Sequence, residues 1–596
     1  PYLDEKLNEF PYVNGGMFSE NNIEVPQFTD ELRDLILNNA SHDFDWSYIS
    51  PTIFGSVFES TLNPEIKREG GMHYTTIQNI HKVIDPLFLN ELREELDEIK
   101  KTKQTKTLKN KLIGFQKKLS ELTFFDPACG SGNFLTETYI SIRRLENEAI
   151  KLIKGENIIL DVEESNIQVH LNQFYGIEIN DFAVSVAKTA LWIAEYQMME
   201  ETKNIIYSNE DFLPLKSYTN VIEGNAIEIE WKNLSKSKTF DYILGNPPFV
   251  ANNGRVSAEE AHSIGTMNEK QKSERISLFG KKGGVLDYVS CWYKKAANYI
   301  QKTNTKCAFV STNSICQGQQ VLPLWEDLLE NDIKINFAHT SFKWNNDSNK
   351  SATVYVVIIG FSVKKNKEPI LYFPNGTFKK VKQINPYLIP AENVLIGKSR
   401  SPISSDAPLM LRGSQPTDNG NLILTTKEKN ELIKEEPKVE QWIRPFSMGG
   451  DFIEGKEKYC LWMPNINPKT LLNLPVTLKR VEKVREFRQK SRKKATQKKA
   501  ETPYRFDEVK VPNSDEYIAV PIVSSGNRKY VPIGFVKNGM IPGNKLFYIS
   551  DGGLYEFGVL ISNVHTAWLE VVGAKYGPSY SYSNTIVYNN FPWPKP

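Results

Sequence analysis

Four consecutive residues near the middle of the chain, Asn246-Pro247-Pro248-Phe249, have the types needed to hold a flat amino group. They follow the apolar run Phe240–Leu244, which predicts a β-strand, so we expect the Asn246 amide at the carboxyl end of that strand. The prolines stiffen the chain and carry no backbone N–H, so carbonyl oxygens face the site. Phe249 offers a planar ring for stacking. Taken in isolation, the tetrapeptide is better interpreted as an ordinary turn.

A glycine-containing segment, Asp126–Asn133, is the second group that could bind a ligand, and its sequence is DPACGSGN. It lies between the apolar run Leu122–Phe125 and an amphipathic stretch, which predicts a strand-to-helix turn. Glycines there let the backbone approach a ligand, and the amides at the helix N-terminus are unpaired donors. The pattern predicts a nucleotide-like or amino-acid-like ligand. The alternative is a tight turn with Asn133 as the helix cap.

An acidic residue, Glu178, ends the next apolar run. An acid at the carboxyl end of a neighbouring strand can accept both hydroxyls of a ribose. Dinucleotide-binding units place this acid about 20 residues after the glycines, whereas Glu178 comes 46 residues after Gly132. The polar stretch Lys154–Gln168 accounts for the extra length. A third apolar run, Asn220–Glu223, is followed by Asn225, which is therefore also expected near the carboxyl end of a strand.

These groups need elements that position them, and the chain alternates apolar runs with helical stretches from residue 122 onward. Such alternation predicts a doubly wound, mostly parallel α/β sheet. We expect seven strands, with an antiparallel edge pair because the link between the last two is too short for a helix. A helical lead-in precedes the sheet, and a Pro-, Gly- and aromatic-rich region from about Pro386 predicts an irregular α+β domain. The apolar runs are Leu122–Phe125, Phe174–Ile179, Asn220–Glu223, Phe240–Leu244, Cys307–Val310, Ile335–Ala338 and Thr353–Phe361.

Charge is informative only locally. The 596 residues include 73 Lys and Arg against 71 Asp and Glu, a net charge of +2, so the total indicates no partner. The exception is Lys479–Lys499, a strongly basic run inside the second region. It could follow a phosphate backbone, and the alternative is a solvated helix.

Several classes of function are excluded or disfavoured. The five cysteines have no close paired spacing and the seven histidines no metal-ligand spacing, so we expect neither a disulfide framework nor a metal site. Gly397-Lys398-Ser399 lacks the first glycine of a phosphate loop because Glu392 stands there, which argues against ATP binding. No run is long enough for a membrane span and no signal sequence is seen, so we expect a cytoplasmic protein without membrane contact.

Taken together, Asp126–Gly132 and Asn246–Phe249 resemble the S-adenosylmethionine-dependent amino-methyltransferases that modify adenine N6 in DNA. Gly71–Thr76, with sequence GMHYTT, matches the N-terminal cofactor motif of that family, and target recognition comes last, which is the γ arrangement. With Phe342–Asn345 and Tyr576–Pro594 included, residues 45 to 596 are similar to the methylase and recognition parts of MmeI-like single-chain restriction–modification enzymes.

The resemblance implies roles for individual residues. Asn246 and the Pro247 carbonyl would accept hydrogen bonds from the target amino group, with Pro248 and Phe249 completing the catalytic motif. Phe249 would stack on a flipped adenine, with Phe342 or Trp344 on its other face. The residues implied to bind S-adenosylmethionine are Thr75, Asp126, Ala128, Gly130, Gly132, Glu178 and Asn225. From the basic run, Arg488, Arg492 and Lys493 are expected to contact DNA.

The implied organisation is an N-terminal segment (1–45), a helical lead-in with the first cofactor motif (46–122), a methyltransferase domain (123–385) and a DNA target recognition domain (386–596). The implied activity is site-specific adenine N6 methylation of double-stranded DNA in restriction–modification or phage defence, by a monomer. One alternative is the methylase portion of a bifunctional enzyme with an upstream nuclease, since the chain starts with Pro1 and its first hundred residues show no nuclease motif. The other is an RNA or protein amino-methyltransferase.

Overall fold

The computed structural model describes residues 27–42, 49–52, 54–55, 75–154, 167–206, 219–235, 238–252, 265–344, 354–364 and 368–595. The chain forms two compact units. The first comprises Pro1–Cys316 and Pro323–Val394, and the second comprises Gln317–Leu322 and Leu395–Pro596. Each unit has its own hydrophobic core, so each buries its own apolar surface.

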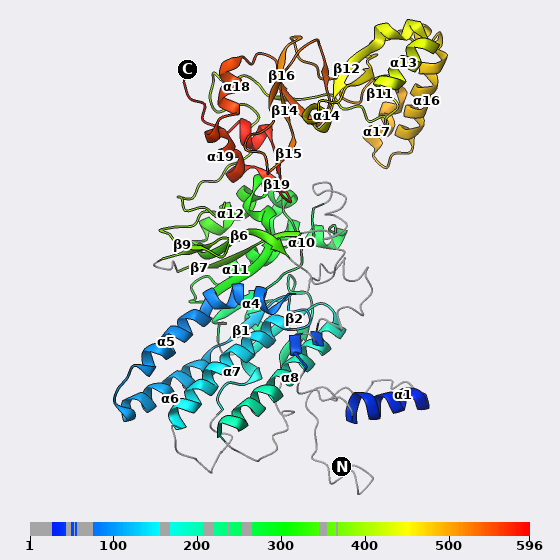
Figure 1. Ribbon diagram of the computed structural model, residues 1–596. Helices are drawn as coiled ribbons and strands as arrows, with labels where there is room; N and C mark the ends of the chain where they lie inside the picture. Colours follow the sequence, from blue (N-terminus) through cyan, green and yellow to red (C-terminus); the bar gives the residue numbers. More distant parts are fainter. Residues whose placement is uncertain are drawn as a thin grey trace. The chain divides into compact units, whose positions relative to one another are not determined.

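A nine-stranded mixed sheet forms the centre of the first unit, in the order β3-β2-β1-β4-β5-β7-β6-β8-β9 (Figure 1). Neighbouring strands from β3 to β5 run parallel, and β7 is antiparallel to both β5 and β6. The strands are β1 (Phe124–Asp126), β2 (Phe174–Glu178), β3 (Asn220–Glu223), β4 (Tyr242–Gly245), β5 (Lys306–Thr312), β6 (Lys334–Trp344), β7 (Val354–Ser362), β8 (Ile370–Tyr372) and β9 (Phe378–Lys380).

The predicted α/β fold with an antiparallel β6–β7 pair is confirmed, but two strands were missed. β8 pairs with β6 and β9 pairs with β8, so the sheet has nine strands and the β6–β7 pair does not lie at its edge. Both additional strands have three residues, and β9 is exposed throughout. Strands this short carry too few residues for an alternating pattern to be recognised in the sequence.

Helices lie between and beside these strands, and α5 and α6 form a helical hairpin (Figure 1). The helices are α1 (Asp30–Asp34), α4 (Ile77–Ile84), α5 (Asn90–Lys100), α6 (Thr105–Glu121), α7 (Asn133–Lys154), α8 (Asp181–Ile206), α10 (Glu269–Phe279), α11 (Ser290–Tyr299) and α12 (Val321–Glu330). Short 3₁₀ or π turns occupy Leu35–His42, Asp85–Leu89, Leu171–Gln173, Trp231–Asn233, Gly280–Val285, Asn313–Cys316 and Gly318–Gln320. None of the helices in the described part of the chain combines the length and apolar composition that a membrane crossing needs.

Aromatic side chains fix the register of the central strands. Phe124 of β1 is the register partner of Phe174 on β2 and of Tyr242 on β4. Its ring stacks on both, with centroid distances of 5.0 Å and 5.5 Å. Tyr139 of α7 meets Phe174 edge-on at 5.4 Å, so the helix after β1 is packed against β2.

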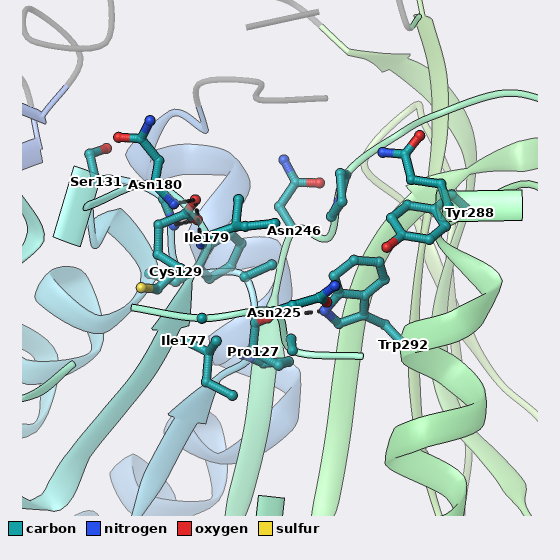
Figure 2. A pocket seen from close by; sticks show the side chains of 18 of the residues that line it. Pro127, Cys129, Ser131, Ile177, Ile179, Asn180, Asn225, Asn246, Tyr288 and Trp292 are labelled. Atoms are coloured by element: carbon teal, nitrogen blue, oxygen red, sulfur yellow. Dashed lines mark hydrogen bonds between the residues drawn. The ribbon is translucent and has the colours of Figure 1, made fainter. Parts of the chain in front are cut away.

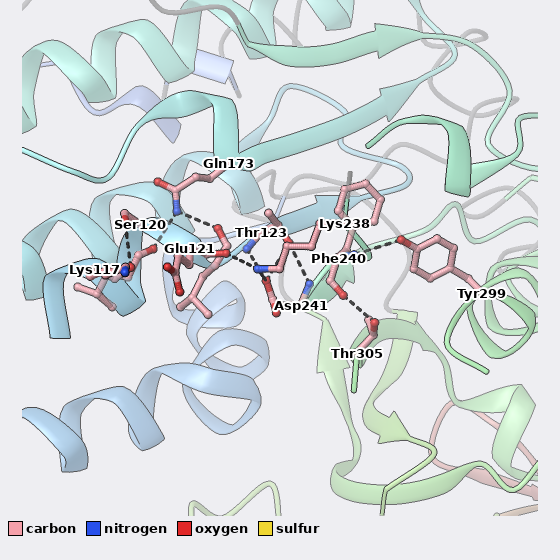
Figure 3. A network of polar contacts seen from close by, with 12 residues as sticks. Lys117, Ser120, Glu121, Thr123, Gln173, Lys238, Phe240, Asp241, Tyr299 and Thr305 are labelled. Atoms are coloured by element: carbon pink, nitrogen blue, oxygen red, sulfur yellow. Dashed lines mark hydrogen bonds and ion pairs between the residues drawn. The ribbon is translucent and has the colours of Figure 1, made fainter. Parts of the chain in front are cut away.

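Polar contacts tie together the chain that enters these strands (Figure 3). The Asp241 carboxylate accepts hydrogen bonds from the backbone N–H and the hydroxyl of Thr123, each at 2.9 Å. Thr305 donates to the Phe240 carbonyl at 2.6 Å, and Gln173 donates to two carbonyls at the end of α6 at 2.8 Å. The amino ends of β1, β2, β4 and β5 are therefore held in register, and their carboxyl ends are left to build a site.

The second unit contains three small sheets, in the orders β10-β18-β14-β16, β11-β13-β12-β17 and β15-β20-β19. Its strands are β10 (Leu411–Arg412), β11 (Ile423–Thr425), β12 (Ile443–Ser447), β13 (Lys458–Leu461), β14 (Tyr517–Pro521), β15 (Val523–Ser525), β16 (Gly534–Val536), β17 (Ile541–Pro542), β18 (Leu546–Ile549), β19 (Ala574–Tyr576) and β20 (Ser579–Ser581). The predicted irregular α+β domain is confirmed.

Seven helices of the second unit surround these sheets: α13 (Thr426–Glu435), α14 (Gly449–Glu454), α15 (Pro468–Leu472), α16 (Pro475–Gln489), α17 (Lys494–Lys498), α18 (Leu554–Leu560) and α19 (Asn563–Val572). Further short turns are Pro437–Trp442, Lys499–Glu501 and Asn584–Tyr588. Glu436 caps α16, because its carboxylate accepts from the backbone N–H groups of Val476 and Thr477 at 2.9 Å and 3.1 Å. A negative charge at a helix N-terminus is favourable, so the basic helix has a fixed starting point.

Candidate active site

A cavity of about 330 Å³ lies where the parallel strands of the first unit end (Figure 2). It is lined by the segments that follow β1, β2, β3 and β4, together with residues of α10 and α11. The strand order changes direction around β1 and β4, and open α/β sheets bind ligands at such a switch point. The lining residues that the sequence predicted are Thr75, Ala128, Gly130, Glu178, Asn225, Asn246 and Pro248.

The glycine loop after β1 is held against β2 and α8. Cys129 donates its backbone N–H to the Ile177 carbonyl at 3.1 Å. Gly132 has φ of 82°, and a Cβ there would lie 2.9 Å from the Ala187 Cβ. A larger residue would therefore push the loop away from α8 and strain its backbone. Gly132 shapes the loop without lining the cavity.

Glu178, at the end of β2, binds the loop directly. One carboxylate oxygen accepts from the Gly130 N–H at 3.0 Å, and the other accepts from the N–H groups of Ile179 and Asn180 at 2.9 Å and 3.0 Å. The side chain is buried and lines the cavity. Glu178 thus fixes two neighbouring strand ends relative to each other, which sequence reasoning did not anticipate.

Asp126 lies behind the cavity and does not line it. Its Oδ1 accepts from the Ala128 N–H at 2.9 Å, and Oδ2 is buried without a hydrogen-bond partner among the described residues. Burial raises the pKa of this carboxyl to about 8. A Cβ at Gly245 would stand 2.4 Å from Asp126 Oδ1, so a glycine is needed where β4 passes this side chain.

The Asn-Pro-Pro-Phe segment brings an amide and a proline into the cavity. Asn246 Nδ2 donates to the Thr75 hydroxyl at 3.2 Å, which joins two positions far apart in sequence. Pro248 lines the cavity and Pro247 is buried beside it. Phe249 is 1% exposed and belongs to the core, so the expected open stacking face is absent in this conformation.

The other two aromatic candidates also lie outside the cavity. Trp344 is buried in the core, and the ring of Phe342 packs against that core with the Lys82 ammonium 4.4 Å from its centroid. The Gly71–Tyr74 part of the N-terminal motif and Asn345 fall outside the described residues. Thr75, the last-but-one residue of that motif, is buried and reaches the cavity.

Sequence reasoning missed one whole wall of the cavity. Asn268 and Glu274 come from α10 and its cap, and Tyr288 and Trp292 come from the segment that enters α11. In Figure 2, Tyr288 and Trp292 lie on the opposite side of Asn246 from Ser131. The two rings meet edge-on at 5.2 Å, and the Trp292 indole N–H donates to the Pro127 carbonyl at 3.1 Å. The four-residue spacing of the two aromatics is the signal that could have revealed this wall.

No group of three or more potential metal ligands occurs among the residues that the structure describes. The Cys129 thiol lines the cavity, but burial raises its pKa well above the ordinary value. A thiol that stays protonated is a poor nucleophile, which fits a structural position.

The basic run of the second unit separates into buried and exposed residues, and the expected DNA contact by Arg488 is wrong. The Arg488 side chain is fully buried, and its guanidinium donates five hydrogen bonds to backbone carbonyls, at 2.8–3.1 Å. These are all the donors that an arginine has, so none is left for a phosphate. Arg492 and Lys493 are exposed and make no ion pair within the described part of the chain.

The strand order and the cavity at its switch point define an α/β domain of the methyltransferase type. A family model described as the MmeI DNA-methyltransferase domain matches residues 99–373, and one described as the MmeI target recognition domain matches residues 390–595.

Comparison with a solved structure gives the same family as the two family models. A solved structure of the type IIL restriction–modification enzyme MmeI in complex with DNA is 41% identical, with a TM-score of 0.89, and the match covers 100% of this chain and 77% of that one. The chain therefore belongs to the MmeI family of restriction–modification enzymes, and the resemblance predicted from the motifs is confirmed.

Two curated proteins are also similar. DNA methyltransferase A of Bacillus subtilis (strain 168) is 38% identical over 598 residues, which cover 99% of this chain and 65% of the relative. A putative type II restriction enzyme and methyltransferase of Methanocaldococcus jannaschii is 27% identical over 278 residues, or 40% of this chain and 22% of the relative. The chain thus spans about two thirds or less of the length of these curated relatives.

Proposed function

We propose that the protein is a site-specific DNA methyltransferase that transfers a methyl group from S-adenosylmethionine to adenine N6 in duplex DNA. The observation that carries the proposal is the convergence of Asn246 and Pro248 with Gly130 and Glu178 in one cavity. An amine-binding motif and a nucleotide-binding motif are then adjacent. Family membership and the family target recognition domain at residues 390–595 favour DNA over RNA or protein as the substrate.

The residues present fit S-adenosylmethionine, which carries a positive charge on its sulfonium group. The volume of about 330 Å³ lies within the range of about 300–1,000 Å³ typical of small-molecule sites. Glu178 lines the cavity, and behind it lies the buried Asp126 Oδ2 without a hydrogen-bond partner among the described residues. The Glu178 carboxylate suits a cationic ligand, and Thr75, Gly130 and Asn225 are the other residues we assign to it.

The bound cofactor would supply an activated methyl group, so the protein needs to position and polarise the target amine. Asn246 and the Pro247 carbonyl would accept hydrogen bonds from the adenine amino group and direct the nitrogen lone pair at the methyl carbon. The hydrogen bond from Asn246 to Thr75 fixes the plane of the amide before the base arrives. Such preorganised acceptors cost no reorganisation during an in-line transfer. No covalent step through Cys129 is required.

The target base must leave the duplex, because the N6 atom cannot reach the cavity from inside a base stack. We assign recognition of the DNA sequence to residues 386–596 and methyl transfer to residues 123–385, with residues 46–122 completing the cofactor site. Arg492 and Lys493 are our proposed phosphate contacts. Stacking of the flipped base on Phe249 would require that ring to leave the core, and Phe342 and Trp344 remain the alternative stacking partners.

The proposal is tested with purified protein, DNA and S-adenosylmethionine labelled in its methyl group. We expect label in DNA, recovered as N6-methyl-2′-deoxyadenosine after digestion and mass spectrometry, at one recurring sequence. RNA and protein substrates run in parallel should remain unlabelled. Label in cytosine, or in RNA or protein alone, would overturn the assignment.

Family membership supports our proposal of a role within restriction–modification or phage defence, and the chain covers 65% and 77% of two longer relatives. We therefore keep the alternative that this chain is the methylase portion of a bifunctional enzyme with a nuclease upstream. Incubation of this chain with unmethylated plasmid and Mg²⁺ should leave the DNA intact. Cleavage would place nuclease chemistry within these 596 residues.

A further inference from the structure

A carboxylate that the sequence did not single out, Glu274, stands in the wall that α10 contributes to the cavity. Its Oε1 accepts from Asn225 Nδ2 at 2.7 Å, and its Oε2 accepts from the Tyr288 hydroxyl. The Glu274 side chain is 10% exposed. Lys270 Nζ is 3.9 Å from Oε1 and lies closer, at 3.0 Å, to Glu228. Two hydrogen bonds from cavity residues therefore hold this carboxylate in place.

The Asn225 amide has a fixed orientation. Its Oδ1 accepts from the Ile227 N–H at 2.9 Å, and its Nδ2 donates to Glu274. Both contacts require the same assignment of oxygen and nitrogen, because an N–H must meet an acceptor and a carboxylate must meet a donor. The amide has a second N–H, for which the described residues provide no partner. Asn225 consequently offers the cavity a donor.

Glu274 offers an acceptor beside that donor. A carboxylate can accept about four hydrogen bonds, and Asn225 and Tyr288 use two. Burial and the bond to Glu274 hold the pKa of the Tyr288 hydroxyl well above its ordinary value, so the hydroxyl stays protonated and donates. The pair formed by Asn225 and Glu274 therefore presents a donor and an acceptor side by side.

We propose that Asn225 and Glu274 read the Watson–Crick edge of the adenine of the bound cofactor, with Tyr288 as the residue that positions Glu274. Adenine has an amino group that can donate to Glu274 and a ring nitrogen, N1, that can accept from Asn225. Hypoxanthine presents the reverse, a carbonyl oxygen and an N1–H, so both contacts would become repulsive. The inference rests on the proposed function, because it assumes that the cavity binds an adenosyl compound.

The test is isothermal titration calorimetry of the full chain with S-adenosylhomocysteine and with its deaminated analogue, S-inosylhomocysteine. Sites that hydrogen-bond a polar group reject an analogue that cannot make the bond by large factors, so we expect the wild-type protein to prefer the adenosyl compound by roughly 100-fold or more. Affinities within threefold of each other would overturn the inference without any variant. No binding of S-adenosylhomocysteine at all would instead refute the proposed function.

Glu274→Gln replaces the acceptor carboxylate by an amide and leaves the other residues of the cavity wall unchanged. The amide can rotate to donate to the hypoxanthine carbonyl, so the preference should fall to about tenfold or less, and S-adenosylhomocysteine should bind roughly tenfold more weakly. An unchanged preference would overturn the role of Glu274. The matched control is Glu269→Gln on the same helix, whose side chain is 91% exposed and pairs with Lys272; it should leave both affinities unchanged.

Tyr288→Phe tests the positioning role. The carboxylate remains but loses the hydroxyl that holds Oε2. Binding of S-adenosylhomocysteine should weaken only a few-fold while the preference for adenine persists. If Tyr288→Phe abolishes the preference, the specificity belongs to the tyrosine and the assignment to Glu274 fails.

Discussion

The cavity of the first unit and the basic segment of the second unit, Lys479–Lys499, differ in how well the sequence predicted the placement of their residues. In the first, residues as distant as Thr75 and Asn246 meet within hydrogen-bonding distance. In the second, neighbours in the sequence are separated, because Arg488 is buried whereas Arg492 is exposed. Position at the end of a strand was a better guide to the residues that line a cavity than residue type was to the exposed residues of a charged run.

The difference follows from the geometry of the two elements. The carboxyl ends of parallel strands meet at one edge of a sheet, so residues that follow several strands must converge. A helix rotates each residue by about 100° from the last, so a basic run is distributed around its axis. On α16 the buried positions are Thr477, Val481, Val484 and Arg488, which have helical spacing. That spacing was readable in the sequence and would have predicted the burial of Arg488.

The largest effect is expected at the cavity, from Asn246→Ala. Loss of a preorganised group at a transition state typically costs about 10²–10³ in rate, so methyl transfer to DNA should fall by roughly 10³-fold. Binding of S-adenosylhomocysteine, measured by calorimetry, should stay within threefold of wild type, since the residues that we propose to bind the cofactor remain. Activity within tenfold of wild type would show that convergence at the strand ends did not identify the reacting centre.

Arg488→Lys is expected to have the next largest effect, on stability. Lysine keeps the charge but has three donors instead of five, so several carbonyls would lose their partners at a cost of about 3 kcal/mol. Hydrogen–deuterium exchange of peptides covering α16 should then accelerate by roughly 100-fold. Arg492→Lys, a control at an exposed position just after α16, should leave exchange unchanged. Equal exchange rates in the two variants would contradict the assignment of Arg488 as buried and Arg492 as exposed.

Much of the fold was predictable from the sequence because its strands alternate with long helices. The seven predicted runs each correspond to a strand, and the order of the motifs placed Glu178 and Asn246 correctly at strand ends. The three-residue strands β8 and β9 were not predicted because they are too short to show an alternating hydrophobic pattern. The wall formed by Glu274 and Tyr288 was not predicted because Glu274 lies on α10 and Tyr288 in the turn before α11, and the two meet only through tertiary packing.

The exposed part of the basic segment should affect DNA binding without affecting stability. If Arg492 and Lys493 each neutralise a phosphate, replacing both with Ala should reduce the slope of log affinity against log salt by about 2. Affinity should fall by roughly tenfold at moderate salt, and equally for all DNA sequences. Fluorescence anisotropy across a salt series measures both quantities. An unchanged slope would mean that the exposed residues form only a solvated surface.

The smallest effect is expected in the first unit, at His81 on α4. Its two ring nitrogens contact Asp85 at 2.9 Å and Glu137 at 3.1 Å, so α4, which begins beside Thr75, is tied to α7. The hydrogen bond to Asp85, followed by that to Glu137, raises the pKa of His81 from 6.5 to about 9.

Because this pKa is raised in the folded state, the protonated form stabilises the fold fully below about pH 6.5, and the contribution is lost as pH rises through about 9. His81→Asn should therefore reduce the free energy of unfolding by about 1 kcal/mol at pH 6, a value reduced for partial solvent screening, and by much less at pH 10. Urea unfolding at both pH values measures the difference, and exposed His170→Asn is the control. A loss that does not depend on pH would mean that His81, unlike Arg488, contributes by packing and not by its charge.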